Sequence, residues 1–318
     1  MSRIMEPLLS ICITSWNTRE LLRDCLRSLY ADRDSRNWEV LVVDNASGDD
    51  SAAMVRTCFP QVELMARSEN LGFVKGNNLA LRRARGRYLL LLNSDTRVEI
   101  GALGQLVDFM EANSQVGIAG PKLLNEDGSL QLSCGISPTL WTETINKLLL
   151  HKLFPFFKLG RWSHGEIRPV GWVTGACLMA RRQAVEQAGL LDCGIFMFYE
   201  DLEWCMRIGQ YGWKIYYLPA SRVVHLGGQS TRQQSREMLV ISQRSLFYLF
   251  HKRFGPVRLQ ILRVLTMVEM VLRSFIWGFF FLFCPDRRSD SRARLWAYRR
   301  ILRKSLTEQS YWAPFKAP

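Results

Sequence analysis

Three residues in this sequence combine reactive chemistry with a suitable position: Asp95, Asp201 and His225. Asp95 follows an apolar run, and hard cations such as Mg²⁺ and Mn²⁺ take few oxygen ligands from a protein when phosphates and water supply the rest. Asp201 falls in the first turn of an expected helix, whose dipole stabilises the ionised carboxylate that a general base requires. His225 lies between a strand-like run and a Gly-rich turn, and imidazole is a common ligand of Mn²⁺.

Each of these residues also has a purely structural interpretation. An aspartate after a strand often forms a turn, and a carboxylate at a helix start often stabilises only that helix. Glu203 and Arg207, four residues apart, would then form a surface ion pair. A lone histidine is more often a hydrogen-bonded structural residue than a ligand. The choice depends on whether other polar residues converge on the same place.

The elements that would position these residues follow the pattern of β-α-β units, because short apolar runs alternate with amphipathic segments up to about residue 120. Strands are expected at Leu8–Thr14, Trp38–Val43, Val62–Ala66, Tyr88–Leu92 and Val116–Ala119. Helices are expected at Glu20–Leu29, Asp50–Phe59, Lys75–Arg85 and Gly101–Asn113, the second entered through Ser47–Asp49. Later elements are a strand at Gly171–Ala180, a helix from Arg182, a helix at Glu200–Gln210 and a strand at Lys214–Leu218.

Open sheets of this kind bind ligands beyond the carboxyl ends of their strands, so the residues there are candidate ligand contacts. Polar residues cluster at these ends: Asn17, Asp44, Asn45, Asn70, Asn93 and Ser94. Asp44 would read a base or ribose; alternatively it forms a turn before a helix capped by Ser47. The segment Asn70–Asn78 has glycines and amides suited to a backbone pressed against a ligand. It does not match G-x-G-x-x-G, and the sequence contains no P-loop, which removes the main support for hydride transfer or ATP hydrolysis.

The C-terminal part differs in charge from the rest of the chain. From Lys252 onward there are 14 Lys and Arg against 4 acids, a net +10 of the whole chain's +13, and this charge accompanies the apolar segment Val257–Phe283. A basic, apolar tail beside a nearly neutral body favours an anionic membrane surface over nucleic acid. The uncharged stretch Ser274–Phe283 is half of the ~20 residues that a span needs, so an interfacial helix or helix pair is favoured over a crossing, with Arg292–Lys304 attracting anionic headgroups. The alternative is an ordinary core hairpin.

Compartment and domain boundaries follow from the same features. The eight cysteines include no C-x-x-C pair, and Leu8–Ile13 leads into a strand rather than a cleavage site. A peripheral protein on the cytoplasmic face of the membrane is therefore expected, with a catalytic domain at 1–250 and a membrane-association segment at 251–318. From Asn125 to Pro169 the alternation breaks, and Leu148–Trp162 has no assigned structure.

Taken together, these segments resemble the family 2 glycosyltransferases, the inverting GT-A fold group, and most closely their bacterial rhamnosyltransferase-like branch. The resemblance runs from about Leu8 to Ser230 and depends on the order and spacing of several short segments. These are Thr14–Asn17, Val43–Ser47, Asn70–Asn78, Asn93–Asp95, Gly175–Cys177, Glu200–Asp201 and His225–Ser230. It implies an α/β fold with a mixed, mainly parallel central sheet, followed by C-terminal amphipathic helices that associate with the membrane.

The resemblance also implies a role for each matching residue. Asp95, at the last position of the family's D-x-D motif, and His225 would bind Mn²⁺ or Mg²⁺, and Asp201 would be the catalytic base. Asn93 replaces an aspartate that many relatives carry, which leaves the metal site one charge short. The implied substrate-binding residues are Thr14, Trp16, Asn17 and Asp44 at the nucleobase, Asn70 and Lys75 near the donor, Trp172, Gly175 and Ala176 toward the acceptor, and Asn93, Ser94 and Glu200 beside the two aspartates.

The implied reaction is a single in-line displacement from a nucleoside diphosphate sugar donor to a polyprenyl-diphosphate-linked saccharide acceptor. L-rhamnose from dTDP-rhamnose is the expected sugar, for bacterial cell-surface polysaccharide. One alternative is a UDP-sugar transferase of the same fold, galactofuranosyl or N-acetylhexosaminyl. Another is a noncatalytic membrane-bound scaffold with a degenerate pocket. A nucleic-acid-binding protein would show steeply salt-dependent binding, and confinement of the charge to an apolar tail speaks against it.

Overall fold

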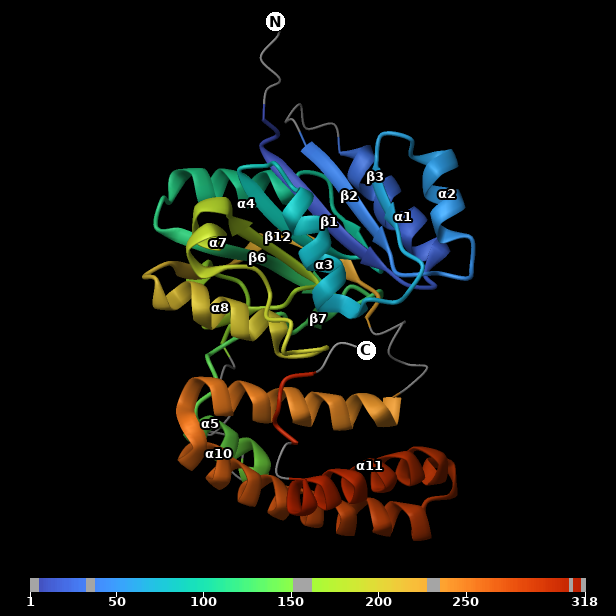
Figure 1. The fold of residues 1–318 in the computed structure, drawn as a ribbon, viewed down its shortest axis with the longest axis vertical. Coiled ribbons are helices and arrows are strands. Elements are labelled where there is room, and N and C mark those ends of the chain that lie inside the picture. Colours follow the sequence, from blue (N-terminus) through green and yellow to red (C-terminus); the bar gives the residue numbers. More distant parts are fainter. Residues whose placement is uncertain (1–5, 33–37, 151–161, 228–234, 309–310, 316–318) are drawn as a thin grey trace, which may run out of the picture. The chain divides into compact units, whose positions relative to one another are not determined.

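The computed structural model describes residues 6–32, 38–150, 162–227, 235–308 and 311–315, which fold into two compact units (Figure 1). The first unit comprises Met1–Ser137, Trp162–Asp192 and Glu200–Ser230. The second comprises Pro138–Arg161, Cys193–Tyr199 and Thr231–Pro318. Residues 151–161 of the unassigned stretch and 228–230 of the family resemblance lie outside the described residues.

The first unit is built on a mixed, mainly parallel sheet in the order β3-β2-β1-β4-β11-β6-β12-β5, with β7 paired to β6 and β9 to β12. The strands that begin before residue 120 are β1 (Leu9–Ser15), β2 (Trp38–Asp44), β3 (Glu63–Ala66), β4 (Tyr88–Asn93), β5 (Thr96–Val98) and β6 (Val116–Leu124). The later ones are β7 (Leu130–Gln131), β9 (Arg168–Pro169), β11 (Cys177–Arg181) and β12 (Lys214–His225), while β8 (Cys134–Gly135) and β10 (Trp172–Val173) form a separate two-stranded sheet. Strands β1 to β4 pair in parallel, and β11 is antiparallel to both of its neighbours.

Helices cover both faces of this sheet. Side chains alternate between the two faces along each strand, and apolar side chains on both faces are buried beneath helices. In β1, Leu9, Ile11 and Ile13 face one core and Cys12 the other. The first core is completed by α1 (Arg19–Ala31), α2 (Ser51–Cys58) and α4 (Ala102–Ala112), and the second by α3 (Gly72–Arg83), α7 (Arg182–Ala188) and α8 (Glu200–Gln210). The strands and helices predicted before residue 120 are confirmed, with ends shifted by a few residues and with β6 longer than expected.

Two later elements differ from the prediction. The strand expected at Gly171–Ala180 is broken into β10 and β11, because the N–H of Cys177 turns back to bond the carbonyl of Thr174. The strand expected to end at Leu218 continues to His225. Its register with β6 shifts between Leu218 and Arg222, so Pro219, which lacks an N–H, lies in an irregularity rather than ending the strand.

The second unit is helical, with α5 (Leu140–Lys147), α10 (Ser235–Phe283), the short 3₁₀ turn η2 (Pro285–Arg287) and α11 (Arg288–Thr307). Gly255, at φ 82° and ψ 176°, breaks α10 into two helical stretches before Pro256. Buried Met270, Tyr298 and Ile301 pack α10 against α11. The helix pair expected in the tail is therefore present. It belongs to a unit that also includes 138–161, 193–199 and 231–250, whereas the functional boundary at 250 remains a prediction.

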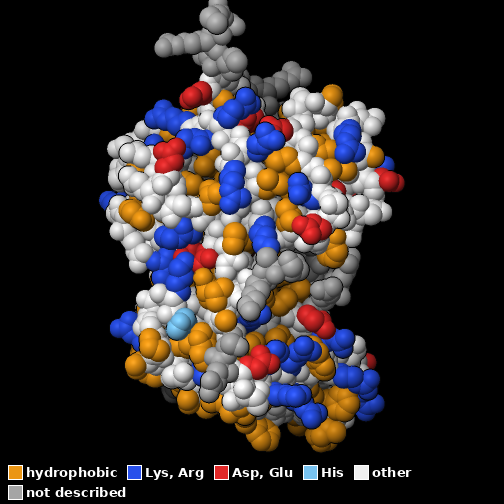
Figure 2. Space-filling model, viewed as in Figure 1, with side chains coloured by type: hydrophobic (Ala, Val, Ile, Leu, Met, Phe, Trp, Pro, Cys, Tyr) orange, Lys and Arg blue, Asp and Glu red, His pale blue; other side chains and the backbone are white. Residues whose placement is uncertain are grey.

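One face of α10 carries a continuous row of exposed apolar side chains. Spaced by one, three or four residues, these are Val257, Ile261, Val264, Val268, Val271, Leu272, Phe275, Ile276, Phe279, Leu282 and Phe283. Figure 2 shows hydrophobic side chains gathered along this part of the second unit, with Lys and Arg around them. We call this row the apolar stripe. Arg236–Phe283 is also long and apolar enough to cross a membrane, judged by length and composition only.

Candidate active site

Asp95 and His225 lie side by side although 130 positions separate them in the sequence. Antiparallel pairing of β5 with β12 sets His225 opposite Thr96, and the N–H of Leu226 bonds the carbonyl of Asp95 at 2.9 Å. The Asp95 Oδ1 and His225 Nε2 atoms are 3.2 Å apart, and both side chains are largely buried. The bulged continuation of β12 is what carries the histidine to this place.

Gln131 on β7 determines which imidazole nitrogen carries the proton. The amide nitrogen of Gln131 donates to Asn125 Oδ1 at 2.9 Å and to the His225 carbonyl at 3.2 Å. Its Oε1 therefore faces His225 Nδ1, 2.7 Å away, so Nδ1 must be the donor. Asn93 Nδ2 lies 3.2 Å from Nε2 and donates to it. Nε2 is therefore the imidazole nitrogen that faces both Asn93 and Asp95.

This donor set fits a divalent cation. Two neighbouring ligands of an octahedral ion with bonds of ~2.1 Å are about 3.0 Å apart, close to the 3.2 Å between the Asp95 and His225 atoms. No third His, Cys, Asp or Glu joins them among the described residues, so phosphate and water oxygens would complete the coordination.

Asp201 lies in the first turn of α8, as expected. Its Oδ2 accepts the N–H of Gly175 at 2.9 Å, and its Oδ1 accepts the N–H of Leu202 at 2.7 Å. Burial raises the pKa of the Asp201 carboxyl, and these two N–H donors lower it in part. The carboxylate is thus held in a fixed orientation with a greater affinity for protons than an exposed aspartate has.

Glu200, directly beside it, has a different environment. Its side chain is buried, and Oε2 has no hydrogen-bond partner among the described residues. Burial first, and then the charge of Asp201, raise the pKa of Glu200 well above its ordinary value. The two neighbouring carboxyl groups therefore differ: Asp201 is supported by two N–H donors, whereas Glu200 Oε2 has no such support among the described residues and its pKa is raised further.

The dipeptide Gly175–Ala176 connects the two halves of the site. The Gly175 N–H bonds Asp201, while the Ala176 carbonyl accepts the N–H of Asn93 at 3.0 Å, at the end of β4. A side chain at position 175 would approach Phe73 and Asp201 at 3.5 and 3.6 Å. One turn of backbone thus links the aspartate of α8 to the strand that leads into Asp95.

The loops after β1 and β2 form a second part of the site. Asn17 and Ser47 bond each other's loops, through Asn17 N–H to Ser47 Oγ at 2.9 Å and Gly48 N–H to Asn17 Oδ1 at 2.8 Å. Asn17 and Ala46 have positive φ, which is uncommon for non-glycine residues and concentrates at ligand-binding loops. Asp44 is buried; its Oδ2 accepts the Ser47 N–H, while Oδ1 has no partner among the residues that the structure describes. An unpaired buried acceptor fits a ligand N–H group, such as that of a pyrimidine base.

The alternative role of Ser47 as a helix cap is wrong. Its hydroxyl accepts a hydrogen bond from Asn17, and Asp49 Oδ1 instead accepts the N–H of Ser51 at the start of α2. Ser47 therefore joins two loops instead of ending one helix.

The remaining predicted residues lie in or directly after β1, at the start of α3, and in the turn after β4. Thr14 Oγ1 is buried and has no hydrogen-bond partner in the described part of the chain. Thr14 closely faces Gly76, where a Cβ would come within 2.7 Å of its methyl carbon. Asn70 Oδ1 accepts the Gly72 N–H at the start of α3. Further positions are Trp16 after β1, Lys75 in the first turn of α3, and Ser94, whose hydroxyl bonds Thr18 at 2.9 Å.

Trp172 lies on the small sheet, and its position does not by itself test its predicted role. Its Nε1 donates to the Ile136 carbonyl at 3.1 Å, which fixes the ring on the small β8-β10 sheet. Within the described residues, no hydrogen bond or ion pair joins Trp172 or Lys75 to Asp95 or Asp201, so their predicted roles remain predictions.

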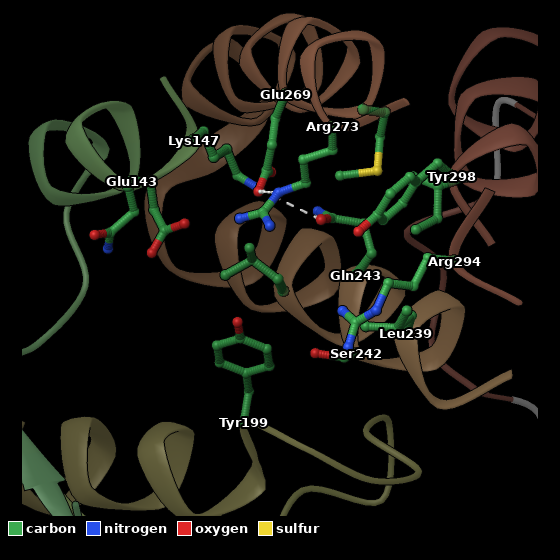
Figure 3. Close-up of a pocket in the computed structure, with 14 residues that line it drawn as sticks. Glu143, Lys147, Tyr199, Leu239, Ser242, Gln243, Glu269, Arg273, Arg294 and Tyr298 are labelled. Carbon is green, nitrogen blue, oxygen red and sulfur yellow. Dashed lines mark hydrogen bonds and ion pairs between the residues drawn. The ribbon is translucent and has the colours of Figure 1, made fainter. Parts of the chain in front are cut away.

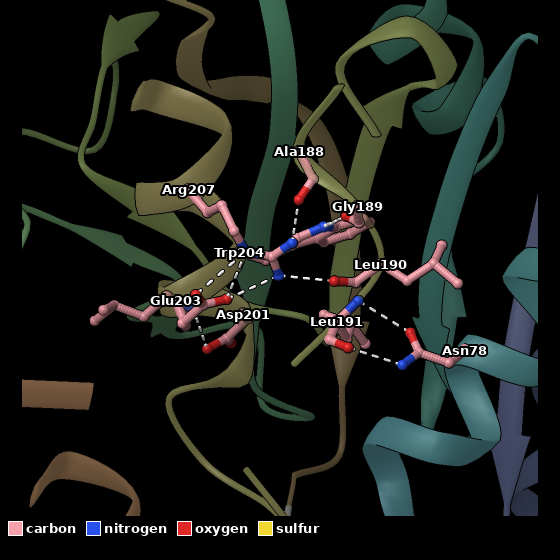
Figure 4. A network of polar contacts seen from close by, with 10 residues as sticks. Asn78, Ala188, Gly189, Leu190, Leu191, Asp201, Glu203, Trp204 and Arg207 are labelled. Carbon is pink, nitrogen blue, oxygen red and sulfur yellow. Dashed lines mark hydrogen bonds and ion pairs between the residues drawn. The ribbon is translucent and has the colours of Figure 1, made fainter. Parts of the chain in front are cut away.

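Figure 4 shows the polar network that fixes α8. Arg207 pairs with Glu203 at 2.9 Å and donates to the carbonyls of Ala188 and Leu190. Asn78 on α3 bonds both the N–H and the carbonyl of Leu191. Glu203 is 0% exposed, so its interpretation as part of a surface ion pair is wrong. The pair braces the loop before Cys193 against the helix that carries Asp201.

Sequence reasoning missed Gln131, Asn78 and the burial of Glu203. Gln131 lies on a two-residue strand with no apolar periodicity, and Asn78 appeared only within a Gly- and Asn-rich segment. No sequence signal identified Gln131. The only signal for Asn78 was that it is an amide residue inside an expected helix, and such side chains usually bond neighbouring backbone groups.

Comparison with family models agrees with this geometry. The model "Glycosyl transferase family 2" matches residues 10–157, and "Glycosyl transferase family group 2" matches residues 88–301, two thirds of the chain. The two matches together contain every predicted site residue.

Individual relatives and solved structures agree as well. The chain is 26% identical over 260 residues to the N-acetylglucosaminyl-diphospho-decaprenol L-rhamnosyltransferase of Mycobacterium tuberculosis, covering 76% of this chain and 83% of that protein. It is 25% identical over 259 residues to the dTDP-rhamnosyl transferase RfbF of Shigella flexneri, covering 79% and 81%. A mannosyltransferase from Pyrobaculum calidifontis, solved with GDP-Man and Mn²⁺, has the same GT-A fold, with a TM-score of 0.56, 17% identity, and coverage of 96% of this chain and 89% of that one. The chain belongs to the family 2 glycosyltransferases, in their rhamnosyltransferase-like branch.

Proposed function

We propose that this protein transfers L-rhamnose from dTDP-rhamnose to a polyprenyl-diphosphate-linked saccharide, in the synthesis of a bacterial cell-surface polysaccharide. Two relatives matched over most of their length are named for rhamnosyl transfer, and one of them for an acceptor on decaprenyl diphosphate. The observation that carries the proposal is the Gly175–Ala176 turn, which bonds Asp201 on one side and the end of β4 on the other. This turn connects the expected base, Asp201, to the strand that leads to the expected diphosphate site at Asp95. Such a connection suits a single displacement reaction in which both act on one donor sugar.

Donor recognition is assigned to the loops after β1, β2 and β3. The unpaired Oδ1 of Asp44 would accept the ring N–H of thymine, and Asn17 holds the neighbouring loop in place. Thr14, with its buried and unpartnered hydroxyl, would face the nucleotide. Trp16, Asn70 and Lys75 would complete the donor pocket.

Asp95 and His225 would hold Mn²⁺ or Mg²⁺. When bound, the cation would neutralise the charge that develops on the leaving diphosphate. The missing charge at Asn93 is consistent with a site that binds its cation together with the nucleotide rather than alone. Ser94, bonded to Thr18, fixes the turn that presents Asp95.

Asp201 would remove the proton from the acceptor hydroxyl, which attacks the anomeric carbon from the side opposite the diphosphate and inverts the configuration. The N–H groups of Gly175 and Leu202 stabilise the ionised form that accepts this proton. Burial and the charge of Asp201 raise the pKa of Glu200, which disfavours a second negative charge beside the base. Trp172, Gly175 and Ala176 would border the acceptor saccharide.

Association with the cytoplasmic face of the membrane is assigned to the second unit. The apolar stripe of α10 occupies one face of the helix, as expected for a helix that lies in the interface rather than crosses it. Basic residues of the tail would attract anionic headgroups, and the acceptor's polyprenyl chain would lie in the same bilayer.

A transfer assay tests the proposal. The full-length protein is incubated with radiolabelled dTDP-rhamnose, Mn²⁺ and polyprenyl-diphosphate-linked N-acetylglucosamine, and the butanol-extractable label is measured. Label should enter the lipid fraction with wild type and not with Asp201→Asn. Transfer from a UDP-sugar but not from dTDP-rhamnose would reject the donor, and transfer by Asp201→Asn at the wild-type rate would reject the base.

A further inference from the structure

A polar cavity lies within the second unit, and nothing in the transfer chemistry above uses it. Its volume is about 440 Å³, within the ~300–1,000 Å³ range of small-molecule sites. Residues of α5, α10 and α11 line it together with Tyr199 (Figure 3). We call it the helical cavity.

The wall of this cavity holds more cations than carboxylates that can balance them. Lys147 and Arg273 share the single carboxylate of Glu269, at 2.9 and 2.8 Å. The side chains of Lys147 and Glu269 are only 5% and 11% exposed. Because charges out of water are unfavourable unless compensated, a lining with three cationic side chains (Lys147, Arg273 and Arg294) against two carboxyl groups (Glu143 and Glu269) favours an added anion.

A second arginine faces the same space. Arg294 donates its Nε–H to Asp290 at 3.1 Å, and its guanidinium stacks on Trp277 at 4.4 Å. The carboxylate bonds of Arg273 and Arg294 both use Nε, and Arg294 also bonds the side chain of Tyr298, another lining residue. Two forked guanidinium groups at one cavity are suited to phosphate oxygens.

The other polar lining residues are consistent with an anion. Glu143 is the remaining carboxyl group of the lining, and burial raises its pKa. Figure 3 shows the hydroxyl groups of Tyr199, Ser242 and Tyr298 around the same space. Hydroxyl groups can donate to phosphate oxygens without adding charge.

The cavity also lies on the helix that carries the apolar stripe. Glu269, Met270 and Arg273 line the cavity, while Val271, Leu272 and Phe275 of the same turns are exposed members of the stripe. An amphiphile whose headgroup entered the cavity would therefore have its hydrocarbon close to the surface assigned to the bilayer. Tyr199 lies two residues before Asp201 in the chain.

We propose that the helical cavity binds the diphosphate of a polyprenyl-linked lipid, with Arg273 and Arg294 as its principal ligands. This inference rests on the proposed function, since it identifies where the acceptor lipid is held. It assigns to the second unit a specific headgroup site in addition to its general attraction to membranes.

Calorimetry with farnesyl diphosphate, a soluble prenyl diphosphate, tests the site. The full-length protein is titrated in mild detergent with EDTA, so that the diphosphate is not captured by a cation at Asp95. The double variant Arg273→Gln/Arg294→Gln should bind about tenfold more weakly or worse, because charge-assisted hydrogen bonds are lost. The matched control is Arg299→Gln, an exposed arginine of α11 outside the cavity, and it should bind as wild type does.

Two further measurements complete the test: binding of inorganic pyrophosphate and, where needed, a single variant. Inorganic pyrophosphate should bind more weakly than farnesyl diphosphate, and equal affinities would refute a lipid-linked ligand. Unchanged affinity in the double variant, or an equal loss in Arg299→Gln, would overturn the site. If the double variant does not fold, the single variant Arg294→Gln, whose side chain is 38% exposed, takes its place.

Donor binding measured on the same preparations separates this inference from the proposed function. A protein that binds farnesyl diphosphate through these arginines but not dTDP-rhamnose with Mn²⁺ would retain the cavity site and lose the proposed donor. A protein that binds the donor but shows no loss in the double variant would retain the function and lose the cavity site.

Discussion

Replacing Gln131 by methionine should weaken metal binding although Gln131 does not contact the cation. Methionine has nearly the same length as glutamine, but its thioether sulfur is only a weak acceptor for the hydrogen bond from His225 Nδ1. The imidazole would then be free to rotate and to carry its proton on Nε2, the nitrogen that faces Asp95. Histidine ligands depend on such partners of the second nitrogen for their orientation and tautomer.

The size of the effect follows from the contacts. The bond from Nδ1 to Gln131 Oε1 is 2.7 Å long and partly buried, and a bond of this kind contributes about 1 kcal/mol net. That corresponds to about fivefold in affinity, and loss of the fixed tautomer adds to it. The expected result is therefore a loss of about tenfold, the lower end of the 10- to 100-fold range typical of such partners.

Titration with Mn²⁺ in the presence of saturating dTDP measures this effect directly, with free Mn²⁺ followed by electron paramagnetic resonance. Gln105→Met, at an exposed position on α4, is the matched control and should bind as wild type does. Wild-type affinity in Gln131→Met would refute the tautomer argument. An equal loss in both variants would attribute the effect to general destabilisation.

Three other predictions concern the base, its support and the membrane face. Asp201→Asn should lower kcat by about 10²- to 10⁴-fold while Mn²⁺-dependent nucleotide binding persists, and in wild type kcat/KM should fall with decreasing pH at a pKa above the ordinary ~3.9 of aspartate. Glu203→Gln should lower the unfolding free energy by about 3–5 kcal/mol, since it leaves Arg207 without its buried carboxylate, and a thermal melt unchanged from wild type would contradict this. Phe275→Gln/Phe279→Gln/Phe283→Gln should reduce cosedimentation with anionic vesicles, and undiminished sedimentation would exclude the apolar stripe as the membrane face.

The sequence predicted the elements that follow simple periodicity. In β1 and β4 the apolar residues define buried strands, and in α1 Leu22, Cys25, Leu26 and Leu29 recur at helical spacing and are all buried. Asp44 and Asp95 each follow a predicted strand, and ligands of such sheets bind at the carboxyl ends of the strands. Their positions in the sequence were therefore enough to predict that they share one edge of the sheet.

The features that the sequence did not predict depend on contacts between residues far apart in the chain. The strand that begins at Lys214 was expected to end at Leu218, but the shift in register allows β12 to continue to His225 and to pair with β5. The Gly175–Ala176 turn looked like continuous strand, because its residues are small and compatible with either structure. The burial of Glu203 depends on Arg207 reaching the Ala188 and Leu190 carbonyls, which sequence spacing does not reveal.

The sequence pattern also did not reveal which segments of the chain make up the second unit. The basic, apolar character of the tail indicated an interfacial helix or a helix pair, and the structure has the two helices α10 and α11. Nothing in the sequence indicated that Lys147, more than a hundred residues earlier, would pair with Glu269 inside that unit. A buried ion pair between distant elements leaves no periodic signal.

Calorimetric titration of the full-length protein with dTDP-rhamnose, with and without Mn²⁺, tests the central claim most directly. Binding of dTDP-rhamnose that requires Mn²⁺, is lost in Asp95→Asn and exceeds the binding of UDP- and GDP-sugars is the predicted result. Preference for a UDP-sugar would contradict the assigned donor, and binding of no nucleotide sugar under either condition would contradict the assignment of this site to glycosyl transfer.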